Sequence, residues 1–276
     1  MSTVYALWLR NMKAFIRDRT RMIFSLVFPF FFIFVFSQIF ANDYIENPII
    51  YMLAGIIIMT VFDVSLRISS STIDDMTTGF MKEVLVSPVS RLSVAAGQFV
   101  SCASVATVQA LLIYAIGFFI GYRITSLLTV FIVVVSMVFV GLVFAGFGLF
   151  IATRVRDIQT YQIVSMAITM PMTFISGAYI PLSGLPITLQ YVAIANPMTY
   201  AVSMFRAVSL EKMTLSPQEL LYEQIALKVG GVIITPAISF LILTVFGVAF
   251  MAASTLSFIN ADFSRINRDK GKSIEW

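Results

Sequence analysis

Histidine is absent from this 276-residue sequence, and cysteine occurs once, as Cys102. Without histidine the chain lacks the commonest metal ligand and the usual acid–base side chain at neutral pH. A Ser-His-Asp triad, a Cys-His pair and a His-x-x-x-His zinc motif are therefore excluded. One cysteine also forms no disulfide within the chain. We accordingly expect no catalytic residue, no metal site and no bound cofactor.

Charge is scarce as well. Only 12% of the residues are charged and 59% are hydrophobic, whereas about 25% of a soluble domain is charged. Because so few charges cannot cover the surface of a soluble protein, we expect the chain to be surrounded by lipid. We predict a single transmembrane domain over residues 1–276. The net charge of +4 indicates membrane topology rather than affinity for nucleic acid.

Apolar runs of the length needed to cross a bilayer, about 20 residues, recur along the chain. They predict an all-α polytopic membrane protein with six transmembrane helices. The first run begins at Met22 and exceeds a secretory signal of roughly 7–15 apolar residues, so we expect it to remain as an anchor. The predicted spans are residues 22–41, 48–68, 97–121, 126–152, 158–175 and 229–258.

The first 21 residues favour an amphipathic helix. Tyr5 and Trp8 recur at helical spacing on one side, and Arg10 and Arg17 lie on another. This pattern is typical of a helix in the membrane interface, with aromatic rings in lipid and basic groups near phosphates. A plain cytoplasmic tail is the alternative.

Residues 69–96 form a long polar stretch, which predicts a cytoplasmic loop that holds a short helix. Ser71 and Asp74 have the spacing of a capping box, and Pro88 ends the helical pattern. We interpret Asp74 and Asp75 as acids that favour the start of this helix rather than as a catalytic pair. The apolar positions at helical spacing are Ile73, Met76, Phe80 and Val84.

Several polar residues fall inside or at the ends of the predicted spans. Asp63 and Arg67 lie four residues apart, so we expect a structural ion pair near headgroup depth. Gln109 and Gln162 predict hydrogen bonds between helices, with contact to a substrate as the alternative. One stripe of small residues in the fourth span predicts close helix packing: Gly141, Ala145, Gly148 and Ala152.

The region after the fifth span is apolar but broken by prolines and glycines. Broken backbone at membrane depth must be buried in protein or line a cavity, so residues 176–200 predict an outer re-entrant helical hairpin between spans five and six. Residues 201–228 are predicted to be an extracellular segment, polar and exposed from about 207. Pro217 is a candidate start of a short helix there. Residues 259–276 are expected to form a cytoplasmic tail.

Lysine and arginine set the orientation. With the N-terminus inside, the predicted inner segments hold fourteen of the 18 basic residues and the outer segments hold four. This asymmetry follows the positive-inside rule. It places both termini in the cytoplasm of a multi-pass protein of the plasma membrane or, in some prokaryotes, the inner membrane.

A nucleotide site is not predicted. The tripeptide at Gly271, Lys272 and Ser273 ends like a P-loop, but that motif requires a glycine five residues earlier, where the chain has Ile266. A transporter with this sequence would need its ATPase on a separate chain.

Three segments together resemble type 2 ATP-binding-cassette permeases, in particular the daunorubicin-resistance and nodulation exporter subfamily. They are the loop from Ile73-Asp74-Asp75 through Glu83-Val84-Leu85-Val86-Ser87-Pro88 to Gly97, the stretch Phe174-Ile175-Ser176-Gly177-Ala178-Tyr179-Ile180-Pro181-Leu182 with Pro186, and Asn196-Pro197-Met198-Thr199-Tyr200 with Arg206. The resemblance covers nearly the whole chain in order and spacing.

The resemblance implies a permease that pairs with a second copy or homologue and is driven by an ATP-binding-cassette ATPase subunit, which binds the ATP. It implies that the protein exports a drug, a lipid or another amphipathic compound, and that it contributes to multidrug resistance. The residues implied in coupling to the ATPase are Ile73, Asp74, Asp75, Met76, Phe80, Glu83 and Leu85. The residues implied in an outer gate are Gly177, Pro181, Pro186, Asn196, Pro197 and Tyr200.

Two other classes remain open from the residues alone. A membrane-embedded lipid-modifying enzyme would need polar catalytic groups clustered at one face, and mid-span carboxylates are scarce here. A stand-alone channel or carrier would work without an ATPase, and secondary carriers often contain internal repeats, of which this sequence has no clear example.

Overall fold

The computed structural model describes residues 3–39, 48–78, 90–122, 126–155, 157–229 and 231–260. Helices dominate these ranges, with one short antiparallel pair of strands. In chain order the elements are α1 (Thr3–Arg17), α2 (Arg19–Ile39), α3 (Pro48–Ser69), α4 (Ser71–Thr77), α6 (Arg91–Ile120), α7 (Leu127–Ala152), α8 (Ile158–Ile175), the 3₁₀ turn η1 (Leu182–Gly184), α9 (Ile187–Ile194), α10 (Pro197–Ser209), α11 (Pro217–Tyr222), β1 (Leu227–Val229), β2 (Val232–Ile234) and α12 (Pro236–Asn260).

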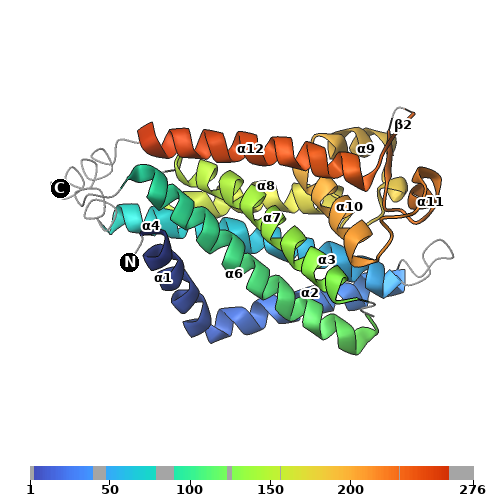
Figure 1. Ribbon diagram of the computed structural model, residues 1–276, viewed down its shortest axis with the longest axis horizontal. Helices are drawn as coiled ribbons and strands as arrows, with labels where there is room; N and C mark the ends of the chain where they lie inside the picture. Colours follow the sequence, from blue (N-terminus) through green and yellow to red (C-terminus); the bar gives the residue numbers. More distant parts are fainter. Residues whose placement is uncertain are drawn as a thin grey trace.

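The long helices run side by side along the longest axis of the molecule (Figure 1). Helices α1 and α4 lie at one end, on the left in this view, where α6 begins and α12 ends. Helices α9 and α11 and the strand pair gather at the other end. We call these the inner and the outer end, after the topology that the basic residues predict.

Among the described residues, four helical segments are long and apolar enough to cross a membrane. They are Pro48–Met76, Arg91–Ile120, Leu127–Ala152 and Pro236–Ile259. They coincide with the predicted second, third, fourth and sixth spans, so a mostly helical chain with apolar helices long enough to cross a membrane is confirmed. Because Ser90 accepts a hydrogen bond from the backbone N–H of Ser93 at 3.1 Å, α6 starts earlier than predicted, at Arg91.

Helices α2 and α8 overlap the predicted first and fifth spans. Each has a proline in its interior, Pro29 in α2 and Pro171 in α8. Within α2 a shorter apolar stretch runs over Met22–Phe31. The crossing of the membrane by these two helices, and thus the count of six spans, stays a prediction.

Helix α3 forms the centre of the bundle, packed against α2, α6, α7 and α10. Most of its side chains are fully buried, including Leu53, Ile57 and Phe62. The ring of Phe62 lies 4.5 Å from that of Phe144 on α7. This helix therefore connects the inner end to the outer end through a continuous apolar core.

The small residues of the fourth span bring helices together as predicted. A Cβ atom added at Gly141 would lie 3.0 Å from the Cα of Ala103 on α6. One added at Gly148 would lie 2.5 Å from the Ser69 hydroxyl at the end of α3. Helix α7 thus approaches α6 at one glycine and α3 at another, and only the missing side chains permit both approaches.

The segment from 207 to 228 is more buried than predicted. All of α10 is buried, to its last residue, Ser209, and so are Ile225 and Leu227 further on. Polar side chains of this buried segment form hydrogen bonds inside the protein. The Ser203 hydroxyl, for example, donates to the Ile225 carbonyl at 2.8 Å. The prediction of exposure was wrong for these parts, whereas the short helix that starts at Pro217 is confirmed.

Candidate functional site

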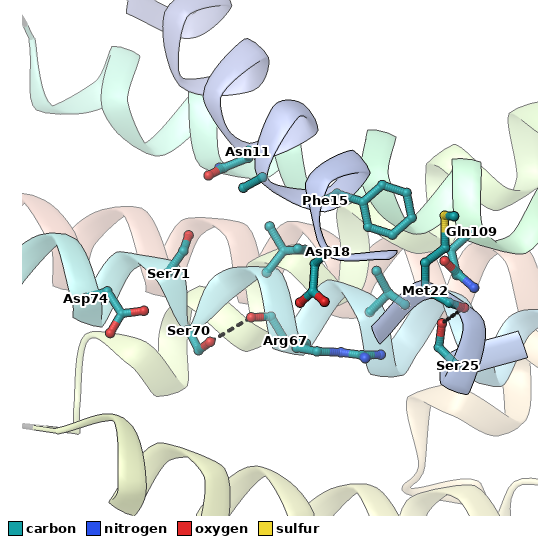
Figure 2. A pocket seen from close by; sticks show the side chains of 13 residues that line it. Asn11, Phe15, Asp18, Met22, Ser25, Arg67, Ser70, Ser71, Asp74 and Gln109 are labelled. Atoms are coloured by element: carbon teal, nitrogen blue, oxygen red, sulfur yellow. Dashed lines mark hydrogen bonds between the residues drawn. The ribbon is translucent and has the colours of Figure 1, made fainter. Parts of the chain in front are cut away.

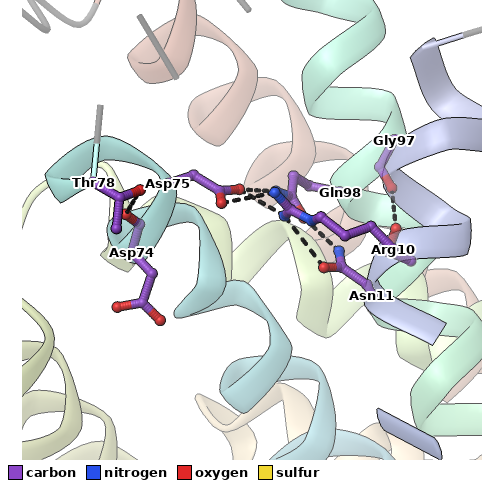
Figure 3. A network of polar contacts seen from close by, with 8 residues as sticks. Arg10, Asn11, Asp74, Asp75, Thr78, Gly97 and Gln98 are labelled. Carbon is purple, nitrogen blue, oxygen red and sulfur yellow. Dashed lines mark hydrogen bonds and ion pairs between the residues drawn. The ribbon is translucent and has the colours of Figure 1, made fainter. Parts of the chain in front are cut away.

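The inner end contains a polar network between α1, α4 and α6 (Figure 3). The guanidinium of Arg10 donates to both carboxylate oxygens of Asp75, at 2.8 and 2.7 Å. On the other side, the Gln98 amide donates to Asp75 at 3.4 Å and accepts from Asn11 at 3.2 Å. The Asp75 and Arg10 side chains are 11% and 35% exposed, and Gln98 is fully buried. The network therefore fixes α1 to the loop helix by a partly buried, bidentate ion pair.

This geometry corrects the role predicted for the two acids. The residue before α4, Ser70, has helical backbone angles and makes no side-chain cap, and the buried Ser71 hydroxyl oxygen has no hydrogen-bond partner. Helix α4 follows α3 almost without interruption, so no free helix start exists for an acid to stabilise. Asp75 instead pairs with Arg10, a residue that the sequence pattern assigned to lipid phosphates.

The other residues predicted to couple to an ATPase divide between the interior and the surface. Ile73 and Met76 are buried in a cluster with Leu7 of α1, so their side chains face into the chain. The Asp74 side chain is exposed and, in Figure 3, points away from the network. Phe80, Glu83 and Leu85 lie outside the described residues.

Helix α1 is held on α6 by close packing as well as by charge. A Cβ atom at Gly97 would lie 2.9 Å from Leu7 Cδ1 and 3.3 Å from the Cα of Val4. The two helix backbones are therefore nearly in contact beside the network. Helix α1 is therefore packed directly against α6 at this point.

At the outer end, the predicted gate residues organise turns and helix starts. Gly177 adopts a left-handed φ of +84°, which glycine tolerates at little cost. Pro181 and Pro186 precede η1 and α9. Asn196 caps α10 by accepting from the Met198 N–H at 3.0 Å.

Two hydrogen bonds tie the start of α10 to its neighbours. The Asn196 amide donates to the Met172 carbonyl of α8 at 2.6 Å. The Tyr200 hydroxyl donates to the Ile194 carbonyl of α9 at 2.6 Å. Pro197 occupies the first turn of α10, where its missing N–H is not needed. The predicted gate residues thus join α8, α9 and α10 at one place.

The sequence predicts that Arg206 lies on the outer side of the membrane. In the structure this residue is buried. It is 2% exposed and donates to the carbonyls of Gly177 and Ala178 at 3.1 and 3.4 Å. Its guanidinium lies 3.5 Å from the ring centroid of Tyr51 on α3. An arginine inside an otherwise apolar helix was the available signal, since such a charge must find partners.

A polar cavity of about 400 Å³ lies between α3 and α8. The predicted ion pair of Asp63 and Arg67 is confirmed and lies in its wall. Helix α8 contributes a polar stripe at helical spacing, Gln162, Ser165 and Thr169. Gln162 is exposed to this cavity, and no hydrogen bond between helices has been found for it in the described part of the chain.

A metal centre has no support in the parts of the chain that the structure describes. In these ranges no three Cys, Asp or Glu side chains lie close enough together to hold an ion. The described residues provide three features: an ion-paired helix cluster at the inner end, a polar cavity beside α8, and a turn at the outer end that Arg206 contacts.

Comparison with known proteins identifies the class. Residues 2–210 match the family model described as ABC-2 type transporter. This match covers well over half of the chain, so the chain belongs to the ABC-2 type transporter family.

Individual relatives are permeases by name. The chain is 28% identical over 160 residues to YbhR, a protein of Escherichia coli K12 that is named as a probable multidrug ABC transporter permease. The aligned residues are 58% of this chain and 43% of YbhR. The chain is 27% identical over 169 residues to the transport permease ycf38 of Cyanophora paradoxa, covering 60% and 56% of the two chains. The chain thus spans about half the length of these relatives.

Proposed function

We propose that this chain is the transmembrane permease subunit of an ATP-driven exporter. Two permeases would form the translocation path, and separate ATPase subunits would supply the energy. The substrate would be a drug, a lipid or another amphipathic compound. Membership of the ABC-2 type transporter family and the permease names of the relatives support this proposal.

The single observation that carries the mechanism is the ion-paired cluster of α1, α4 and α6. Helix α4 leads into the loop that the family resemblance assigns to the ATPase contact. Because Asp75 is bound to Arg10 and to Gln98, a push on this loop would move α1 and α6 together. An ATPase that closes on ATP would thereby shift the equilibrium between two arrangements of the bundle.

The cavity beside α8 is the candidate for the path. Polar side chains at membrane depth mark substrate pathways by default, and here Gln162 and Thr169 follow the ion pair of Asp63 and Arg67. The outward face of α8 also exposes Ile163 and Met170. A second permease placed against this face would enclose the cavity.

The proposed topology retains six spans, with α2 as the first and α8 as the fifth, and with both termini in the cytoplasm. Residues 176–200 would form the outer re-entrant hairpin, and the gate would include Gly177, Pro181 and Asn196. Arg206 would hold this gate from below.

Site-directed cross-linking tests the coupling directly. A cysteine at the exposed position Thr78, in a Cys102→Ala background, is expected to cross-link to the ATPase when both proteins are expressed together. A cysteine at Ser183, at the outer end, is the matched control and should give no such product. A cross-link at Ser183 but not at Thr78 would contradict the proposed docking face.

A further inference from the structure

The elbow between α1 and α2 has an inward side, which borders a cavity of about 210 Å³ (Figure 2). Gln109 of α6 lines this cavity. Its amide is buried and has no hydrogen-bond partner within the described residues, so the bond predicted between helices is not formed. Asp18 is exposed overall, but Figure 2 shows its carboxylate directed from the elbow toward α3. The acid of the elbow therefore lies on the inward side.

The surface of the same elbow carries positive charge. Lys13 and Arg17 of α1 and Arg19 at the start of α2 are all exposed. Within the described part of the chain, none of these three side chains forms a hydrogen bond or an ion pair. Arg10, three residues before Lys13, differs because it is bound to Asp75. Three cations therefore remain available to a partner outside the chain.

An apolar strip lies beside this charge on α1. Tyr5 and Ile16 are 43% and 60% exposed, and their spacing of eleven residues, about three helical turns, places them on one face. Lys13 and Arg17 are four residues apart and share the neighbouring face. Leu7, by contrast, is buried against α6. Helix α1 therefore has one side packed on the protein, one exposed apolar side and one exposed basic side.

The exposed surface changes from basic to apolar just beyond the elbow. Ile23, Phe24 and Val27 of α2 are 56%, 68% and 57% exposed. Val27 follows Arg19 by eight residues, which is about 12 Å along a helix. A change from free cations to exposed apolar side chains over this distance is typical of the boundary between lipid headgroups and acyl chains. The elbow therefore has the surface expected at headgroup depth.

We propose that this surface is a docking site for phospholipids of net negative charge. The side chains of Lys13, Arg17 and Arg19 bind the phosphates, and Tyr5 and Ile16 enter the adjoining acyl region. Every phospholipid carries a phosphate, so an interfacial helix by itself implies no preference among them. A zwitterionic headgroup brings its own ammonium close to the three cations, whereas an anionic headgroup does not. The elbow therefore selects anionic lipid.

Docked lipids hold α1, and through the pair of Arg10 and Asp75 also α4, at the membrane surface. The competing occupant is an acidic protein surface, such as one on the proposed ATPase subunit. Lipid is favoured because its acyl chains also cover the apolar strip at Tyr5 and Ile16, which a charged protein surface would leave bare. Lipid docking needs neither transport nor an ATPase, so its failure would leave the proposed function untouched.

Trp8 on α1 can report the lipid around this helix, since its ring centroid lies 5.8 Å from that of Tyr5. The sequence has one other tryptophan, Trp276, which is replaced by phenylalanine. The Trp276→Phe chain, purified without an ATPase, is reconstituted in bilayers of phosphatidylcholine that contain a minority of phosphatidylglycerol. Bromine atoms, which quench tryptophan fluorescence at short range, are placed on the acyl chains of one lipid or of the other at identical bilayer composition.

We expect phosphatidylglycerol to be enriched around Trp8 by about twofold or more over its share of the bilayer at low salt. The ratio should fall toward one at high salt, because salt screens exposed charges. Replacing the three cations together, by Lys13→Gln, Arg17→Gln and Arg19→Gln, should bring the ratio close to one at low salt. Lys228→Gln removes an exposed cation at the outer end and is the matched control, which should retain the enrichment.

A single position gives a second comparison that does not require the triple variant. Arg17→Lys keeps the charge and should keep the ratio, whereas Arg17→Gln should lower it. The proposal is overturned if the Trp276→Phe chain shows no enrichment, if the triple variant retains it, if high salt leaves it unchanged, if Lys228→Gln abolishes it, or if the two variants at Arg17 behave alike. No enrichment, together with protection of Trp8 by added ATPase subunit, would assign the surface to that protein instead.

Discussion

Asp75→Asn removes the charge from the centre of the inner network while keeping the shape of the side chain. Breaking a fully buried ion pair costs about 3–5 kcal/mol, whereas exposed pairs contribute about 0.2–1 kcal/mol. With exposures of 11% for Asp75 and 35% for Arg10, this pair lies between these limits. We expect a loss of about 2 kcal/mol, since the asparagine removes the carboxylate charge that the partly buried Arg10 guanidinium binds.

This loss should appear as a lower unfolding temperature of the purified chain. At about 2–4 °C per kcal/mol for a chain of this size class, the midpoint should fall by about 4–8 °C. Asp74→Asn is the matched control, because its carboxyl points away from the network (Figure 3). It should lower the midpoint by less than half as much in lipid-free protein.

A double-mutant cycle isolates the pair itself. Arg10→Met alone should destabilise the chain, and the double variant should be less destabilised than the sum of the single effects, with a coupling of about 1–2 kcal/mol. If the two effects add to within about 0.3–0.5 kcal/mol, the ion pair does not join α1 to α4 and the reasoning is refuted.

Three further predictions concern other parts of the chain. Gly55→Ala should lower the free energy of unfolding by about 1–3 kcal/mol, because the added Cβ would overlap the Ala178 carbonyl oxygen. The control Gly184→Ala meets no close atom and should change it by no more than about 0.5 kcal/mol. Equal unfolding midpoints for the two variants would contradict this packing. Arg206→Met should lower the free energy of unfolding by about 2–3 kcal/mol and speed proteolysis at the outer turn. Unchanged cleavage would show that Arg206 does not stabilise this turn. The pKa of Asp157 lies below its ordinary value because the carboxylate accepts hydrogen bonds, first from a backbone N–H and then from a hydroxyl. Its support for the start of α8 is therefore fully present above the unfolded pKa of about 3.9 and lost as pH falls through the lower folded value, which carbon-detected NMR titration would show; a titration at or above the ordinary value would be inconsistent with this cap.

The apolar helices and their packing were predictable because their signals are local. A long apolar run between polar turns requires a spanning helix, and small residues at helical spacing permit close contact. Gly148 is an example: the sequence pattern predicts that another helix approaches closely there, and the structure shows that this helix is α3, at Ser69. The ion pair of Asp63 and Arg67 could be predicted in the same way, since both residues lie on one helix face.

Interactions between distant segments were not predictable in the same way. Arg10 and Asp75 are 65 residues apart, and each alone has a sufficient local explanation, the one as a phosphate ligand and the other as a helix cap. Arg206 likewise read as a surface charge after a proline-rich region. Only the fold reveals that carbonyls and the Tyr51 ring surround it, because neither partner has a pattern that points to arginine.

The most direct test of the account is ATP-dependent uptake into inside-out membrane vesicles. The vesicles contain this chain with or without the proposed ATPase subunit, and a panel of fluorescent amphipathic amines and lipids serves as candidate cargo. The account predicts uptake of at least one compound only when ATP, the ATPase and the chain are all present, and its loss with Asp75→Asn. Equal uptake by the chain without any ATPase would contradict it.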